Sequence, residues 1–205
     1  MDTGGVFESM ENSGVLSDIR EKGIDWVYVT PVDNPLIELV DPTFIGYAQK
    51  ERLDVIGKTI VRTDSKQKSG VFCLVDGKIN VLEYTEITPE LMSKQNEDST
   101  LYLSYAHINC NMFKVNTINK ILKKDIPYHV AKKKCTYMDL DGKIVVPENP
   151  NAYKYEKFIF DYFPYIKNIG IYVVDRSKEY EPVKSDADKA RGAYINKGGL
   201  KWKHI

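Results

Sequence analysis

A chain of 205 residues, 42% of them hydrophobic, can bury the core of one good-sized domain. Its 29 basic and 29 acidic residues cancel, which makes a nucleic-acid partner unlikely and gives no case for a membrane. No apolar run approaches the roughly 18 residues that a membrane-spanning helix requires. Cys73, Cys110 and Cys135 are scattered and form no C-x-x-C pair, as is typical of reduced thiols, so we expect a cytoplasmic protein.

Helices and strands alternate in the first third of the chain. Three apolar residues within 15–19 share one helical face, and Gly23 can end that helix. The run 26–30 consists of β-branched and aromatic residues, which predicts a strand buried on both faces. Asp41 and Pro42 predict the N-cap and first position of the next helix. A second strand is expected over 53–61.

Paired strands dominate the middle of the chain. Asp76-Gly77 lies between the strand-like runs 71–75 and 79–84, and this dipeptide favours a type I′ hairpin turn. Asp141-Gly142 indicates a second hairpin of the same kind. The remaining patterns predict helices over 90–94, 115–122 and, from the spacing of its aromatic residues, 155–163, and strands over 101–105 and 169–174. The order of elements predicts an α/β fold with a mixed sheet.

A turn follows the 26–30 strand, and it could carry function. Pro31 and Pro35 cannot donate ladder hydrogen bonds, so Asp33 and Asn34 come just past the strand's carboxyl end. Ligands bind at such ends in open α/β sheets. A carboxylate there can hold Mg²⁺ against a phosphate. The alternative is that both residues serve only as turn formers.

Several stretches in series resemble the UDP-N-acetylglucosamine pyrophosphorylase and UDP-sugar pyrophosphorylase family. They are PVDNP (31–35) with DPTFIG (41–46), SGVF (69–72) with VLEYTE (81–86), HVAKKK (129–134), YEKFIFD (155–161) and EPVKSDAD (181–188). The resemblance covers about residues 4–188. It implies a Rossmann-like nucleotidyltransferase domain that, with Mg²⁺, transfers a uridylyl group from UTP to a sugar 1-phosphate. We therefore expect residues 1–188 to form part of such a domain, followed by a basic, poorly ordered tail over 189–205.

The resemblance also implies roles for individual residues. Asp33 matches the acidic residue at the metal and phosphates, and Lys184 matches a lysine that neutralises phosphate. Gly70 and Glu83 match positions lining the sugar, where the carboxylate accepts hydrogen bonds from sugar hydroxyls. Phe158 and Phe160 match the aromatic walls of the sugar pocket.

The chain departs from the family's pattern at both ends and at one pocket position. It lacks the Gly-rich nucleotide loop, and it stops before the family's C-terminal β-rich extension. Gly4 and Gly5 resemble a later loop of the nucleotide (cofactor) site, although Asp2 and Thr3 precede them. The dipeptide 106–107, Ala-His, stands where acetylglucosamine enzymes carry Gly-Asn. His107, with Asn109, therefore takes the place of the sugar-binding amide, and the sugar could be glucose or another hexose.

Other interpretations of the same residues stay open. Glu83 could be an exposed strand carboxylate, each of the two phenylalanines could pack in the core, and His129 reads as a structural histidine. The whole chain could be an inactive homologue with a binding or scaffold role. Since the 26–30 strand is predicted to be buried on both faces although few residues precede it, we expect strands of the domain to be missing and a sheet edge to be exposed. We hence expect a homo-oligomer or a separately encoded N-terminal half as partner.

Overall fold

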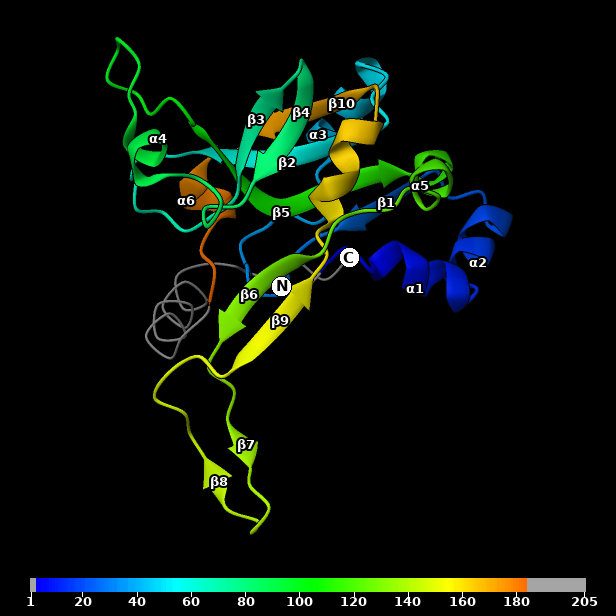
Figure 1. The fold of residues 1–205 in the computed structure, drawn as a ribbon. Coiled ribbons are helices and arrows are strands. Elements are labelled where there is room, and N and C mark those ends of the chain that lie inside the picture. The colour runs from blue at the N-terminus through cyan, green and yellow to red at the C-terminus, as the bar shows by residue number, and fades with distance from the viewer. Residues whose placement is uncertain (1–2, 184–205) are drawn as a thin grey trace, which may run out of the picture.

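The computed structural model describes residues 3–183 (Figure 1). The predicted tail over 189–205 and Lys184 lie outside the described residues. A six-stranded mixed sheet forms the centre, in the order β10-β2-β5-β3-β4, with β1 also paired to β5. The strands are β1 Trp26–Val29, β2 Val55–Val61, β3 Val71–Val75, β4 Lys78–Leu82, β5 Tyr105–Lys114 and β10 Ile169–Val173. Only β10 and β2 pair in parallel, so the predicted mixed sheet is confirmed.

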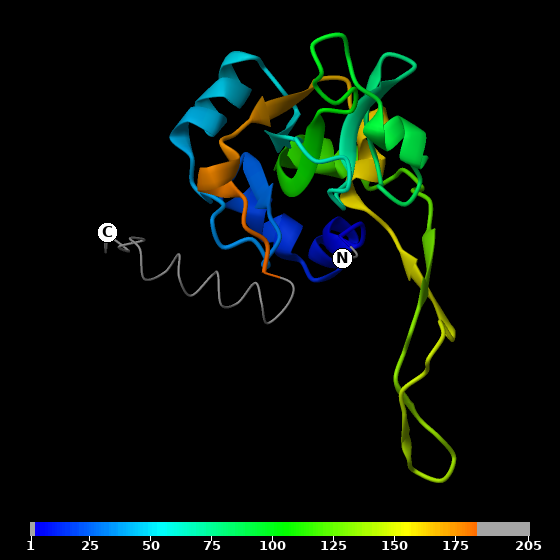
Figure 2. The same ribbon diagram turned by 90° about the vertical axis from the view of Figure 1, so that its left-hand side faces the viewer.

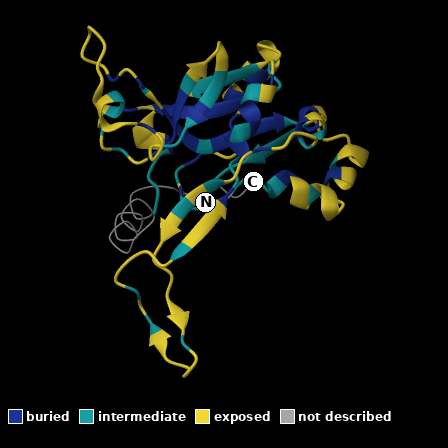
Figure 3. Ribbon diagram, viewed as in Figure 1, coloured by how far each residue is buried: buried dark blue, intermediate teal, exposed yellow. Residues whose placement is uncertain are grey.

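Helices cover both faces of this sheet. One face carries α1 Val6–Asn12, α2 Val15–Glu21, α5 Val115–Ile121 and the 3-10 helix η1 Ile159–Tyr165, which bury a large aromatic core. The other face carries α3 Pro42–Lys50 and α6 Arg176–Glu179. A short helix, α4 Pro89–Ser93, follows the β3–β4 hairpin. The sheet's central strands are consequently the most buried part of the molecule (Figure 3), as expected for an α/β domain.

Local sequence signals set several of these elements as predicted. The Asp41 carboxylate accepts hydrogen bonds from Thr43 N at 2.9 Å and Phe44 N at 3.1 Å, which caps α3. Asp76 and Gly77 have φ of 50° and 73°, as the type I′ turn between β3 and β4 requires. Gly23, with φ of 66°, ends α2 in the left-handed conformation.

A long arm projects from the body (Figures 1 and 2). It begins as the pair β6 His129–Lys133 and β9 Ala152–Glu156 and continues as β7 Tyr137–Met138 and β8 Ile144–Val145. The second hairpin therefore exists, but its turn is not type I′. Gly142 alone has positive φ there, and the Asp139 carboxylate closes a wider turn by accepting hydrogen bonds from the backbone at 141 and 143.

Three further expectations were wrong. β1 is half-exposed rather than buried on both faces, because it pairs on one side only. The aromatic run 155–163 is not one helix, since Tyr155 lies exposed in β9 and η1 begins at Ile159. The strand expected over 101–105 makes only an isolated bridge between Gln95 and Leu101, and β5 starts at Tyr105. Among the described helices, none is long and apolar enough to cross a membrane.

Candidate functional site

A cavity of about 500 Å³ opens near the carboxyl end of β1, between the body and the base of the arm. Its lining draws on segments that span most of the described sequence. Seven of the residues singled out from the sequence meet in it: Asp33, Gly70, Glu83, His107, Asn109, Phe158 and Phe160. We call this cavity the main pocket.

Gly70 and Glu83 are brought together by the β3–β4 hairpin. A Cβ atom on Gly70 would lie 2.8 Å from Val81 Cγ1 and 3.2 Å from Glu83 Oε1, so the glycine makes room for the carboxylate. Burial, and next the neighbouring Glu86 carboxylate, raise the pKa of Glu83. Glu83 is half-buried at the pocket wall and is not a fully exposed strand carboxylate.

His107 and Asn109 lie on an irregular stretch of β5. The register with β2 shifts between Gly57 and Thr59, and Asn109 adopts a left-handed φ of 56° there. Such bulges re-aim side chains next to sites. His107 is 4% exposed, and its Nε2 lies 3.1 Å from Asn111 Oδ1. Burial lowers the pKa of His107 to about 4, so it is a neutral imidazole near neutral pH.

Phe158 and Phe160 form one wall of the main pocket. Their rings stack with centroids 4.9 Å apart and an interplanar angle of 17°. Phe160 is 2% exposed and also contacts the His107 ring at 5.3 Å, whereas Phe158 is half-buried. Phe158 is the N-cap residue of η1 and lies outside the helix, whereas Phe160 lies within it, so both rings can face the main pocket.

The Asp33-Asn34 turn is fixed by a distant part of the chain. Asn34 Nδ2 donates to Glu179 O at 2.8 Å, and Asn34 Oδ1 accepts from Glu181 N at 2.9 Å. Val183 N donates to Asp33 O at 2.7 Å. The buried Asn34 side chain therefore clamps the chain around residues 179–183 beside Asp33, in addition to any role in the turn.

Gly4 and Gly5 do not line the main pocket. Gly4 N donates to Lys157 O at 2.8 Å, and a Cβ on Gly4 would lie 2.5 Å from Lys157 Cβ. The glycine thus permits close contact between the N-terminal segment and the strand end at 157. Gly5 is the N-cap of α1 and has open space around it.

Three titratable residues of the pocket region were missed as a group by the sequence analysis. His129 Nδ1 lies 2.8 Å from Glu86 Oε1, and its Nε2 lies 3.0 Å from Asp161 Oδ2. His129 and Glu86 line the main pocket, and Asp161 lies behind the phenylalanine wall. The residues come from three separate segments, so no local spacing in the sequence connects them.

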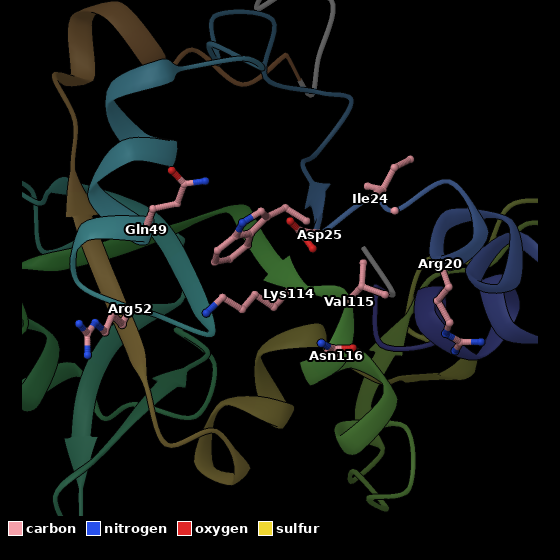
Figure 4. Close-up of a pocket in the computed structure, with 10 residues that line it drawn as sticks. Arg20, Ile24, Asp25, Gln49, Arg52, Lys114, Val115 and Asn116 are labelled. Atoms are coloured by element: carbon pink, nitrogen blue, oxygen red, sulfur yellow. The ribbon is translucent and has the colours of Figure 1, made fainter.

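A second cavity, of about 540 Å³, lies at the opposite end of β1 (Figure 4). Trp26, Gln49, Arg52 and Lys114 are among the residues that line it, and Lys114 Nζ lies 5.4 Å from the centre of the Trp26 ring. None of the candidate site residues predicted from the sequence lines it. It is therefore separate from the candidate site.

A mixed sheet with helices on both faces, and a polar pocket at the carboxyl end of a strand, define the chain as part of a nucleotidyltransferase-type α/β domain. The family model described as UTP–glucose-1-phosphate uridylyltransferase matches residues 2–191. The chain belongs to that family.

Its relatives include a UDP-N-acetylglucosamine pyrophosphorylase of Saccharomyces cerevisiae, 32% identical over 97% of this chain. A UDP-N-acetylhexosamine pyrophosphorylase-like protein of Xenopus tropicalis is 35% identical over 98% of it. The chain covers 44% and 40% of those two proteins, so it spans less than half of their length.

Solved structures show the same relationship. A protein of Entamoeba histolytica, assigned as a UDP-N-acetylglucosamine pyrophosphorylase, superimposes with a TM-score of 0.82 at 30% identity. The match covers 96% of this chain and 52% of that one. A Trypanosoma brucei UDP-N-acetylglucosamine pyrophosphorylase in complex with an inhibitor gives a TM-score of 0.72 at 30% identity, over 86% of this chain and 36% of that one.

Proposed function

We propose that this chain carries the sugar-phosphate side of a uridylyl transfer from UTP to a sugar 1-phosphate, and that the main pocket holds the sugar. The observation that supports this is the convergence of Asp33, Gly70, Glu83 and the phenylalanine pair in one cavity. These residues lie in separate segments and have no local reason to meet. A carboxylate with aromatic walls suits a sugar, whose hydroxyls donate hydrogen bonds and whose ring C–H faces are apolar.

The chemistry requires alignment of two anions and no covalent intermediate. A phosphate oxygen of the sugar 1-phosphate attacks the α-phosphorus of UTP, a new P–O bond forms, and pyrophosphate leaves. Glu83 orients the sugar from one side, and the Phe158–Phe160 wall orients it from the other. By family resemblance Lys184 neutralises phosphate charge; in the sequence it follows Val183, whose backbone is bonded to Asp33.

The donor set at the pocket fits Mg²⁺. Asp33 supplies one carboxylate, and Mg²⁺ typically takes one or two carboxylates together with substrate phosphates. When bound, Mg²⁺ would neutralise charge on the transferred phosphoryl group. Within residues 3–183, the one cluster of three metal-type ligands, Glu38, Asp41 and Glu179, is unsuited, because Lys58 Nζ already lies 3.2 Å from Asp41 and 2.5 Å from Glu179.

The identity of the sugar depends on His107. The neutral ring can donate one hydrogen bond, and its Nε2 is already engaged with the Asn111 side chain. The ring is bulkier than the amide that the family resemblance leads one to expect there. Asn109, exposed to the same cavity by the irregular stretch of β5, can supply an amide in its place. We therefore propose a hexose 1-phosphate as ligand, with N-acetylglucosamine 1-phosphate and glucose 1-phosphate as the two probes.

Replacing Glu83 tests the pocket directly. A hydrogen bond to a charged group contributes about 1.5–3 kcal/mol, so Glu83→Ala should weaken binding of the better probe by roughly ten- to hundred-fold. Isothermal titration calorimetry measures the dissociation constants. Glu90→Ala, an exposed carboxylate on α4 away from the pocket, is the matched control and should bind as the parent protein does. If Glu83→Ala and the parent protein bind the probe with equal affinity, the sugar does not bind in this cavity. The inactive-homologue interpretation would then replace the present one.

Replacing Lys184 tests the phosphate contact. Lys184→Ala should weaken binding of the same probe at least as much as Glu83→Ala, because it removes a cation opposite a phosphate. The loss should shrink as salt is raised, since screening already weakens that contact. Glu83→Ala should show no such salt dependence. A Lys184→Ala effect that is constant between low and high salt would show that the lysine does not face the phosphate.

A further inference from the structure

His129 lies between two carboxylates that come from different parts of the fold. Nδ1 is 2.8 Å from Glu86 Oε1, and Nε2 is 3.0 Å from Asp161 Oδ2. An ionised carboxylate can only accept hydrogen bonds, so both ring nitrogens must carry a hydrogen, which describes the imidazolium. The ring thus joins β6 of the arm to the turn after β4 and to the first turn of η1.

Each of these carboxylates also accepts a backbone hydrogen bond from a residue of the main pocket. Glu86 Oε2 accepts from Glu83 N at 3.2 Å, and Asp161 Oδ2 accepts from Phe158 N at 3.1 Å. One imidazolium is therefore connected through Glu86 to Glu83, and through Asp161 to Phe158. The charged ring also lies 4.7 Å from the Phe158 ring, which stacks on Phe160.

The charged groups around His129 favour the protonated ring. Glu86 faces it from the turn after β4, Asp161 from η1, Glu83 from the pocket, and Glu156 from the opposite position in β9. Lys154 lies further out and pairs with Glu156 at 2.6 Å.

These surroundings shift three pKa values. Partial burial alone would lower the pKa of His129, but Asp161 and Glu86 outweigh it and raise the pKa. Burial raises the pKa of Asp161, and the imidazolium offsets part of that rise. Burial raises the pKa of Glu83 as well.

We propose that His129 is a positioning residue for the main pocket, which as an imidazolium sets the separation between Glu83 and the Phe158–Phe160 wall. The role concerns the same site as the proposed function and rests on it for the identity of the ligand. His129 itself need not touch the sugar.

The sign of the pH dependence follows from the two protonation limits. When pH rises through the raised pKa of His129, the ring loses one hydrogen and one carboxylate loses its donor. That carboxylate then faces the others without a cation and is no longer held by the ring, so the residue that is hydrogen-bonded to it loses its connection to the other side of the pocket. When pH falls through the pKa of Asp161, His129 loses an acceptor, and when pH falls through the pKa of Glu83, the sugar loses its carboxylate. The pocket is therefore complete only between these limits.

Binding of N-acetylglucosamine 1-phosphate and of glucose 1-phosphate across pH tests the link to the ligand. Affinity of the parent protein should fall about tenfold as pH rises through the His129 pKa, as expected for loss of one charge-assisted hydrogen bond. His129→Gln should bind about tenfold more weakly near neutral pH and lose that alkaline limb. Lys132→Gln, which removes a positive charge from an exposed position on the same strand, should retain the parent's affinity and pH profile. A His129→Gln protein with the parent's profile would overturn the proposal.

Nuclear magnetic resonance of the ligand-free chain tests the same role without any sugar. Both ring nitrogens of His129 should be protonated near neutral pH, and the Phe158 ring resonances should titrate with the same midpoint. Asp161→Asn should lower that midpoint. If the titration is seen but neither probe binds, the proposed function fails while the role of His129 in shaping the pocket stands. If either nitrogen is unprotonated near neutral pH, or Phe158 does not respond, the role of His129 is excluded whatever the chain binds.

Discussion

Lys58 shows how a single residue can hold two helices on one face of the sheet. Its side chain is completely buried beneath α3 and α6, with Nζ 3.2 Å from Asp41, 2.5 Å from Glu179 and 5.3 Å from the Phe44 ring. Burial alone would lower the pKa of Lys58, but Glu179 and Asp41 outweigh it and raise the pKa. Asp41 caps α3 and Glu179 ends α6, so this lysine anchors both helices to β2.

Lys58→Met should therefore destabilise the chain strongly. Removal of one partner leaves two buried carboxylates without a cation, which typically costs about 3–5 kcal/mol of unfolding free energy. Urea unfolding measures this against Lys78→Met, an exposed lysine on β4.

The pKa of Asp41 gives the pH at which this loss should change. Burial alone would raise it, but Phe44 N and Lys58 hold it below its usual value. The stability that the Asp41 carboxylate contributes is thus fully present above the pKa of about 4 that it has in the unfolded chain. This stability is lost as pH falls through the lower pKa that it has in the folded chain. The penalty of Lys58→Met should consequently shrink in acid. A penalty of less than 1 kcal/mol at neutral pH, no larger than that of Lys78→Met, would contradict the anchoring role.

At the scale of elements, β1 is an edge strand: like β4 and β10, it is paired on one side only within the described sheet. It bonds to β5 from Trp26 to Val29, and its first residue, Trp26, lines the second cavity. The strand contains no proline and no charged residue, which are the usual protections of a free edge. By contrast, the outer strand β4 carries Lys78.

We expect this edge to drive self-association of the isolated chain, or its pairing with a strand supplied by another polypeptide. The mean mass in multi-angle light scattering should rise with protein concentration. This rise should persist in high salt, because backbone hydrogen bonds and apolar contacts are weakly screened. One sharp monomer peak over the whole concentration range would rule out association through β1.

At the scale of the whole molecule, local chemistry determined how much could be predicted. Asp41-Pro42 and Asp76-Gly77 encode a cap and a turn within a few residues, so the helix and hairpin that they begin were found. β5 was missed because its apolar pattern is broken by polar side chains at 107, 109 and 111. The first two line the main pocket, and the third contacts His107. The aromatic run 155–163 imitated a helical stripe, although a strand ends within it and a 3-10 helix begins.

The candidate site follows the same rule. The family resemblance identified pocket residues such as Glu83 and Phe158 one at a time, since each lies in its own motif. It gave no sign of the charge arrangement that connects them through His129. That arrangement depends on how close Glu86 and Asp161 lie to the histidine in the folded chain. Tertiary distances between separate segments are not encoded in any local pattern.

The clamp on the Asp33-Asn34 turn also determines when the pocket can form during synthesis. The backbone groups that the Asn34 side chain binds are 145 and 147 residues later in the chain. β10, which must pair in parallel with β2, is likewise made near the end of the described sequence. A growing chain can close the β3–β4 hairpin at once but cannot close these long loops until their far ends have left the ribosome. The main pocket can therefore be completed only after residues 179–183 have been made.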